Sequence, residues 1–186
     1  MNKLKNLIRK IYCLFSKFML LNVHKVNLQI NDYFFPPDYC DLYNLYCLAM
    51  KREPNVILEV GSGYSTLVFA EALDRISNKK NDGEERIHYC LEQDEKYLRI
   101  IKDYIGQKFS QYVRFIKTDL VIKEVANQKV SICSNFPDVK INLFYEDRTD
   151  HKEFPIAGDA IIIENIMPDN FTISVDGMRR TVDFYI

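Results

Sequence analysis

The sequence predicts an α/β domain built on a mainly parallel β-sheet, and three observations support this fold class. The first is an apolar run at residues 56–60, which is rich in β-branched side chains and typical of a strand covered on both faces. The second is the regular alternation of strand-like and amphipathic helical segments after residue 37. The third is composition, because 186 residues with 47% hydrophobic residues suit one domain with an ordinary core.

A glycine-rich turn follows the first strand and leads directly into a helical segment. Gly61 and Gly63 let the chain turn sharply and bring bare backbone N–H groups near a ligand. The match to a dinucleotide fingerprint is incomplete, because Thr66 stands where that motif has its third glycine. Glu59, at the end of the strand, suits a positively charged ligand and would repel a pyrophosphate. A glycine pair that serves only the steric needs of the turn is the alternative.

The segment from Glu59 to Thr66 resembles the first motif of the class I methyltransferases that use S-adenosylmethionine, and bacterial members in particular. The resemblance covers roughly residues 37–186. It implies a Rossmann-like sheet of order 3-2-1-4-5 with helices on both faces, in which Glu59 helps to place the cofactor's amino group. Five strands can be counted where the family has seven, so the last hairpin of the full fold is expected to be missing.

Acidic residues follow the second and third expected strands. Glu92 ends the strand at residues 87–92, where an acid can accept hydrogen bonds from two ribose hydroxyls. A role as a strand end or helix cap remains open for Glu92. The resemblance implies that Asp119, after the strand at 113–117, contacts the adenine amino group. The expected cofactor-binding residues are Glu59, Gly61, Ser62, Gly63, Ser65, Glu92 and Asp119.

The fourth strand, at residues 141–145, is followed by Glu146 and Asp147. Ligands of open α/β sheets bind at the carboxyl ends of the strands, so both acids should face the methyl donor. Asp147 is the candidate catalytic residue, as a general base for a hydroxyl acceptor. A metal site with Asp150 and His151 is the less favoured interpretation, and no metal is expected. The fifth strand, at 171–177, should bring Asp176 and Arg179 to the same edge.

Residues 1–36 are expected to form an amphipathic helix and an extended arm, outside the domain at 37–186. Apolar residues recur at helical spacing through residues 2–22, between basic side chains. Lys17 interrupts the apolar run and no cleavage site follows, which argues against a signal peptide. The run is also too short and too charged to span a bilayer. The helix therefore packs on its own domain or a second subunit, or it lies in a membrane surface.

Charge and cysteine content limit the possible binding partners and the cellular compartment of the protein. A formal net charge of −1 argues against a general nucleic-acid binder. Five cysteines form no Cys-x-x-Cys pair and are expected to be buried free thiols in a reducing compartment. The expected location is the cytoplasm, with attachment to the inner face of the membrane as a second option.

The expected function is transfer of a methyl group from S-adenosylmethionine to a small-molecule or sugar acceptor. A non-catalytic binding or scaffold domain, which could form a homodimer, is the first rival. A nicotinamide-dependent oxidoreductase is the second rival, and both Thr66 and Glu59 argue against it.

Overall fold

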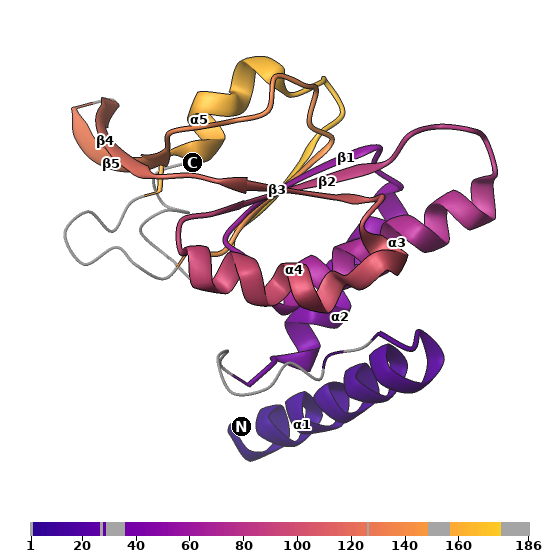
Figure 1. The fold of residues 1–186 in the computed structure, drawn as a ribbon. Coiled ribbons are helices and arrows are strands. Elements are labelled where there is room, and N and C mark those ends of the chain that lie inside the picture. Colours follow the sequence, from indigo (N-terminus) through magenta and orange to yellow (C-terminus); the bar gives the residue numbers. More distant parts are fainter. Residues whose placement is uncertain (1, 27, 29–35, 126, 149–156, 176–186) are drawn as a thin grey trace.

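The computed structural model describes residues 2–26, 28, 36–125, 127–148 and 157–175 (Figure 1). The expected strand-like arm at 26–35 lies largely outside this part of the chain. Asp150, His151, Asp176 and Arg179 also lie outside it.

Five parallel strands form the central sheet in the order β3-β2-β1-β6-β7. The strands are β1 (Val56–Val60), β2 (Ile87–Glu92), β3 (Val113–Lys117), β6 (Leu143–Glu146) and β7 (Thr172–Val175). Every neighbouring pair in this sheet is parallel. The predicted order 3-2-1-4-5 is therefore confirmed, with β6 and β7 as its fourth and fifth strands.

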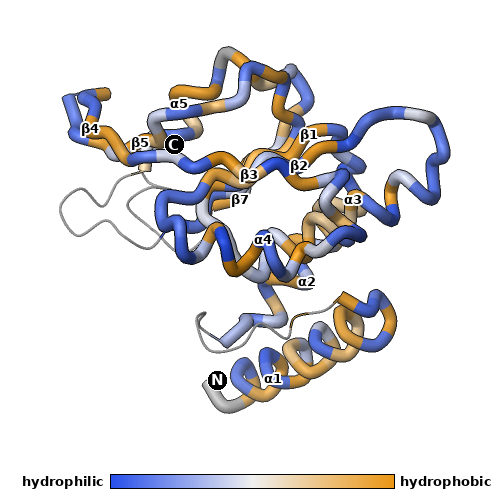
Figure 2. Tube along the Cα trace, in the orientation of Figure 1, coloured by the Kyte–Doolittle hydropathy of each residue, from blue (hydrophilic) through white to orange (hydrophobic). Residues whose placement is uncertain are grey.

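Helices cover both faces of this sheet (Figure 1). On one face lie α2 (Tyr39–Arg52), α3 (Tyr64–Lys80) and α4 (Glu95–Phe109). On the other lies α5 (Asp159–Ile163), which continues into the short 3-10 turn η2 (Glu164–Ile166). The polar loop between α3 and β2 is mostly hydrophilic in Figure 2, as expected of a surface connection.

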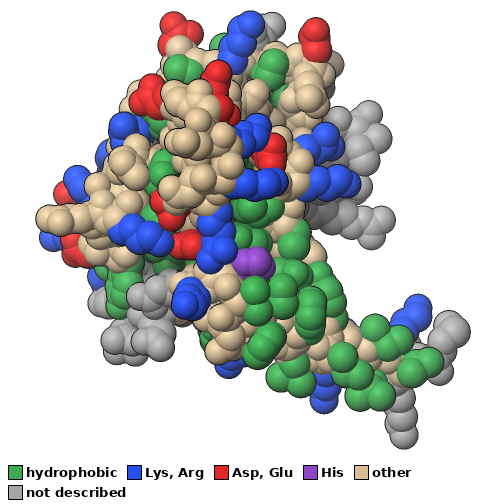
Figure 3. All heavy atoms as spheres, turned by 90° about the vertical axis from the view of Figure 1, so that its right-hand side faces the viewer, with side chains coloured by type: hydrophobic (Ala, Val, Ile, Leu, Met, Phe, Trp, Pro, Cys, Tyr) green, Lys and Arg blue, Asp and Glu red, His purple; other side chains and the backbone are tan. Residues whose placement is uncertain are grey.

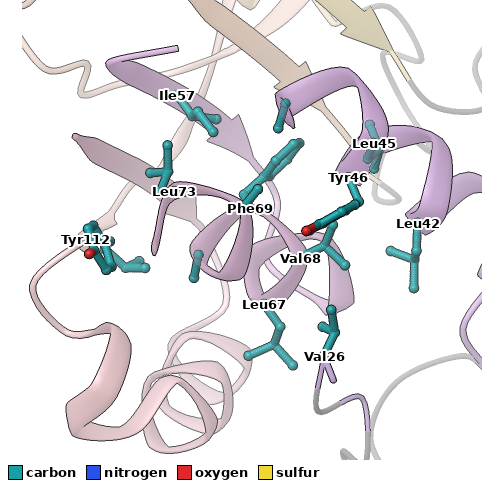
Figure 4. Packing of buried hydrophobic residues seen from close by; sticks show 14 of the residues in the cluster. Val26, Leu42, Leu45, Tyr46, Ile57, Leu67, Val68, Phe69, Leu73 and Tyr112 are labelled. Atoms are coloured by element: carbon teal, nitrogen blue, oxygen red, sulfur yellow. The ribbon is translucent and has the colours of Figure 1, made fainter. Parts of the chain in front are cut away.

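Side chains of β1 alternate between two apolar cores, one on each face of the sheet. Ile57 faces α3 and packs with Phe69 and Leu73 (Figure 4). Leu58 faces the other way and packs with Phe144 and Ile163. Burial on both faces explains why the strand is a continuous apolar run rather than an alternating one.

A two-stranded antiparallel hairpin between β3 and β6 was not expected from the sequence. It consists of β4 (Leu120–Val125) and β5 (Gln128–Cys133) and projects beyond the end of β3 (Figure 1). Val121 and Ile122 are both exposed on β4, so this strand lacks the alternation that would have revealed it.

The N-terminal helix α1 (Asn2–Phe18) and the π-helical turn η1 (Met19–Val23) lie beside α2. None of the helices in the described part of the chain has both the length and the apolar content that a membrane crossing requires.

The expectation of five buried free thiols is wrong at three positions. Cys13 of α1 and Cys40 of α2 form a disulfide, and Cys47 is exposed. Cys90 and Cys133 are buried and free, as expected. The pair was missed because α1 folds back along α2 and brings two Cα atoms 27 positions apart to 5.0 Å. Cysteine content therefore no longer supports a reducing compartment.

Candidate functional site

A cavity of 490 Å³ lies at the carboxyl ends of β1, β2 and β6, within the usual size range of small-molecule sites. Its walls come from the turn after β1, the end of β2, the residues after β6, the hairpin and the start of α2. Six of the expected site residues lie in these walls: Gly61, Ser62, Gly63, Ser65, Glu92 and Asp147. Glu59 and Asp119 do not.

The cavity wall is strongly acidic. Five carboxylate residues contribute to it, whereas Arg148 is the one cationic residue among the described residues of the wall. The five are Asp38, Asp41, Glu92, Asp94 and Asp147. A wall of this charge favours a cationic ligand and opposes a pyrophosphate.

Gly61 occupies a position that no other residue can take without a backbone shift. Its φ is +94°, in the left-handed region that favours glycine. A Cβ built there would fall on the carbonyl oxygen of Asp147 and lie 3.0 Å from its carbonyl carbon. The Gly61 N–H donates to the Leu91 carbonyl at 2.9 Å. The turn is thus wedged between the ends of β2 and β6.

Glu92 attaches this turn to the end of β2. Its Oε2 accepts hydrogen bonds from the Ser62 N–H at 2.9 Å and the Ser62 hydroxyl at 2.7 Å. Its Oε1 accepts one from the Asp94 N–H at 2.8 Å. A carboxylate has about four acceptor positions, so one remains for a ligand. The expected contact with ribose stays a prediction, and fixing the Ser62 backbone is a second role that the sequence did not reveal.

Glu59 lies beneath the turn and is not among the residues of the cavity wall, so its expected contact with a ligand stays a prediction. It is fully buried, and its two oxygens accept hydrogen bonds from the hydroxyls of Ser65 at 2.5 Å and Thr66 at 2.7 Å. His88 Nε2 lies 3.0 Å from Glu59 Oε2. The Thr66 hydroxyl also accepts the Gly63 N–H at 3.1 Å. Glu59 therefore acts on the cavity through the conformation of the turn.

Asp119 faces solvent and is not among the residues of the cavity wall, so its expected contact with a bound adenine stays a prediction. Its side chain is 87% exposed and lies 3.7 Å from the Lys117 ammonium. The residues on either side, Thr118 and Leu120, line the cavity instead. The hairpin causes this, because the Asp119 N–H donates to the Ser134 hydroxyl and turns the chain into β4.

The start of α2 forms the wall opposite the sheet. Leu42 and Leu45 supply an apolar surface there, and Asp38 caps the helix by accepting the Cys40 N–H at 2.9 Å. Tyr39 and Tyr43 of the same helix are not among the wall residues. The wall tyrosines are Tyr64, Tyr97 and Tyr145.

Burial favours the neutral forms of two wall side chains, Cys133 and Tyr64, and of Cys90, which lies outside the wall. Burial, followed by the negative charge of Asp159, raises the pKa of the Cys133 thiol in the wall. Burial, followed by the negative charge of Glu59, raises the pKa of the Cys90 thiol in the same way. Burial also raises the pKa of Tyr64. Neither thiol supplies a thiolate near neutral pH, which argues against covalent catalysis by cysteine here.

A buried ion cluster anchors the end of β6. Arg148 Nη2 lies 3.0 Å from Glu146 Oε1 and 2.6 Å from Asp159 Oδ2, and it donates to the Ser131 carbonyl at 2.9 Å. Asp159 Oδ1 accepts the Cys133 N–H at 2.7 Å. The cluster therefore joins β6, β5 and α5. Glu146, which was expected to face the methyl donor, belongs to this cluster and lies outside the wall, whereas Asp147 lies in it.

Arg148→Met is expected to lower the free energy of unfolding by about 3–5 kcal/mol, because it leaves two buried carboxylates without their cation. The control is Arg99→Met, which breaks an ion pair whose side chains are both 73% exposed. Arg99→Met should lower the free energy of unfolding by no more than about 1 kcal/mol. Urea denaturation measures both variants. Equal losses in the two variants would show that the buried cluster contributes nothing specific.

Solved structures that are similar to this chain include two with TM-scores above one half. One is the SAH-bound methyltransferase PaMTH1 of Podospora anserina, with a TM-score of 0.51, 15% identity and 90% of this chain covered. The other is a protein-L-isoaspartate O-methyltransferase, with a TM-score of 0.52, 11% identity and 90% covered. The chain has the fold of these methyltransferases. It spans 61% of the first and 55% of the second. No family model matches the sequence, and no curated protein matches it significantly.

Proposed function

We propose that this chain binds S-adenosylmethionine in the cavity and transfers its methyl group to a nucleophilic atom of a small-molecule or sugar acceptor. The observation that carries the proposal is the acidic wall around a glycine turn. Five carboxylate residues and the Gly61–Gly63 backbone line one cavity at the carboxyl ends of the strands. A sulfonium and an ammonium group suit such a wall, whereas the pyrophosphate of a nicotinamide dinucleotide does not.

The residues of the wall fit the parts of this cofactor. Glu92 and the Ser62 hydroxyl offer acceptors for the ribose, and the aromatic and aliphatic side chains of Tyr97 and Leu120 offer apolar surface for the adenine. The similar PaMTH1 structure is SAH-bound, which supports the same ligand class for this fold. The cofactor would supply an electrophilic methyl group, and the chain would contribute chiefly by positioning donor and acceptor.

Asp147 is the proposed general base for a hydroxyl acceptor. It follows β6 directly, lies in the wall, and has its backbone N–H hydrogen-bonded to the Val60 carbonyl at 2.9 Å. This bond sets the backbone of Asp147 beside the glycine turn. A carboxylate there could accept the proton of the acceptor hydroxyl as the acceptor oxygen bonds to the methyl carbon, while the sulfur–methyl bond breaks and S-adenosylhomocysteine leaves.

Isothermal titration calorimetry with S-adenosylmethionine, S-adenosylhomocysteine and NAD⁺ tests the ligand class. We expect both sulfur compounds to bind and NAD⁺ not to bind. Binding of NAD⁺ alone would overturn the proposal in favour of the oxidoreductase rival. Incubation with methyl-labelled donor and a panel of phenols, sugars and nucleosides then tests transfer. Donor binding without label transfer to any acceptor would favour the non-catalytic rival.

A further inference from the structure

The N-terminal helix α1 presents an uncovered apolar stripe. Seven large apolar side chains recur at intervals of three and four residues, which places them on one side of the helix. Each is about half exposed or more, from 49% for Phe15 to 69% for Leu14. In Figure 3, hydrophobic side chains gather along the helix at the bottom of the view. The seven are Leu4, Leu7, Ile8, Ile11, Leu14, Phe15 and Phe18.

The opposite side of α1 is the one attached to the domain. The Tyr12 hydroxyl donates to Asn44 Oδ1 at 2.6 Å, Cys13 is disulfide-bonded to Cys40, and Ser16 is fully buried. This arrangement is the reverse of an ordinary surface helix, which buries its apolar side. The domain holds α1 by these groups and by one edge-on contact between the Phe15 and Tyr43 rings, and the rest of the apolar stripe faces away from it. Soluble monomers rarely expose an apolar patch of this extent.

The charge of α1 indicates what covers the stripe. All five charged residues of this helix are basic, although the whole chain has a formal net charge of −1. Three of them, Lys3, Lys10 and Lys17, recur every seven residues in the sequence, a spacing that assigns them to one flank of a helix, and we call these three positions the lysine row. The Lys17 ammonium also lies 5.0 Å from the centre of the Tyr39 ring. Lys5 and Arg9 are the other two basic residues of the helix. The surface that meets this helix should therefore be apolar in its centre and anionic at its edge.

We propose that α1 docks on the surface of an anionic membrane, with the apolar stripe in the acyl boundary and the lysine row at the level of the headgroups. A second copy of the chain fits less well, because its own α1 would bring the same positive charges into the contact. The helix would lie in the membrane plane, because its exposed apolar side chains share one side of it.

Sedimentation of the full chain with lipid vesicles tests the proposal. One set of vesicles contains phosphatidylcholine alone, and the other contains a phosphatidylcholine–phosphatidylglycerol mixture. We expect binding to the anionic vesicles, weakening with added salt, and little binding to the neutral ones. Ile11→Gln should weaken anionic binding about tenfold, and Lys10→Gln about fivefold. Both side chains are exposed, so neither change should unfold the domain.

Ile122→Gln is the matched control, because Ile122 is 46% exposed on β4 against 58% for Ile11. Its binding should equal that of the unsubstituted chain. Three outcomes would overturn the proposal: equal losses in the Ile11 and Ile122 variants, equal binding to neutral and anionic vesicles, or no vesicle binding. If vesicle binding is absent, analytical ultracentrifugation shows whether the stripe joins two copies, because Ile11→Gln would then dissociate a dimer.

Discussion

Gly61→Ala should weaken binding of S-adenosylmethionine by more than about 100-fold, which corresponds to about 2.7 kcal/mol. The added Cβ would occupy the position of the Asp147 carbonyl oxygen. An alanine at a φ of +94° also carries a backbone cost of about 1–2 kcal/mol. The overlap with Asp147 can be removed only if the turn or the end of β6 moves, and both segments carry cavity residues. Calorimetry measures the affinity, and thermal unfolding measures the accompanying loss of stability.

Gly83→Ala separates the two causes, because Gly83 shares the unusual backbone and lacks the collision. Its φ is +74°, and nothing lies within 4 Å of a Cβ built there. Gly83 is in the loop between α3 and β2 and is not among the cavity residues. We expect a loss of about 1–2 kcal/mol in stability and no change in affinity. If Gly61→Ala behaved like Gly83→Ala, close contact with Asp147 would not be what requires glycine.

The sheet and the position of the cavity could be predicted because their signals are local. The apolar run at residues 56–60 is buried on both faces, and the glycine turn follows it directly. Acids at the ends of successive parallel strands must meet at one edge, which brought Glu92 and Asp147 to the cavity. Neither inference needs knowledge of contacts between distant segments.

The positions of the other acidic side chains depend on tertiary contacts that cannot be predicted from the sequence. Glu59 is buried because the first turn of α3 folds two hydroxyls onto it. The pair Ser65 and Thr66, six and seven positions after a strand-end acid, was an available signal for this bond. Asp119 faces solvent because a hairpin begins there. The partners Arg148 and Asp159 meet only once β6 and α5 have packed.

Glu92→Ala should also weaken binding of S-adenosylmethionine by about 100-fold or more. The substitution removes acceptors from the Ser62 N–H, the Ser62 hydroxyl and the Asp94 N–H, and bonds to a charged group are worth about 1.5–3 kcal/mol each. The affinity of Glu92→Gln should lie between those of the unsubstituted chain and Glu92→Ala. An amide has one acceptor oxygen, and its NH₂ would face a backbone donor. Calorimetry on the unsubstituted chain, Glu92→Gln and Glu92→Ala measures the three affinities.

Asp119→Asn is the control for charge near the cavity. This side chain is 87% exposed and lies outside the wall, so the change should alter the affinity less than about threefold. A loss of affinity as large as that of Glu92→Ala would support the adenine contact that the resemblance implies for Asp119. It would also show that the hairpin moves when the ligand binds.

Two roles are proposed for Glu92, contact with the ribose and support of the Ser62 backbone, and a double-mutant cycle with modified ligands distinguishes them. The 2′-deoxy and 3′-deoxy analogues of S-adenosylhomocysteine each lack one ribose hydroxyl. If Glu92 accepts a hydrogen bond from that hydroxyl, the losses from Glu92→Ala and from the deoxy ligand should overlap, with a coupling above about 0.5 kcal/mol. If Glu92 only holds the Ser62 backbone in place, the two losses should add. Ser62→Ala removes the 2.7 Å hydroxyl bond and leaves the 2.9 Å N–H bond, so it should reproduce only part of either loss. An unchanged affinity in Glu92→Ala would contradict both roles and the cofactor site built on them.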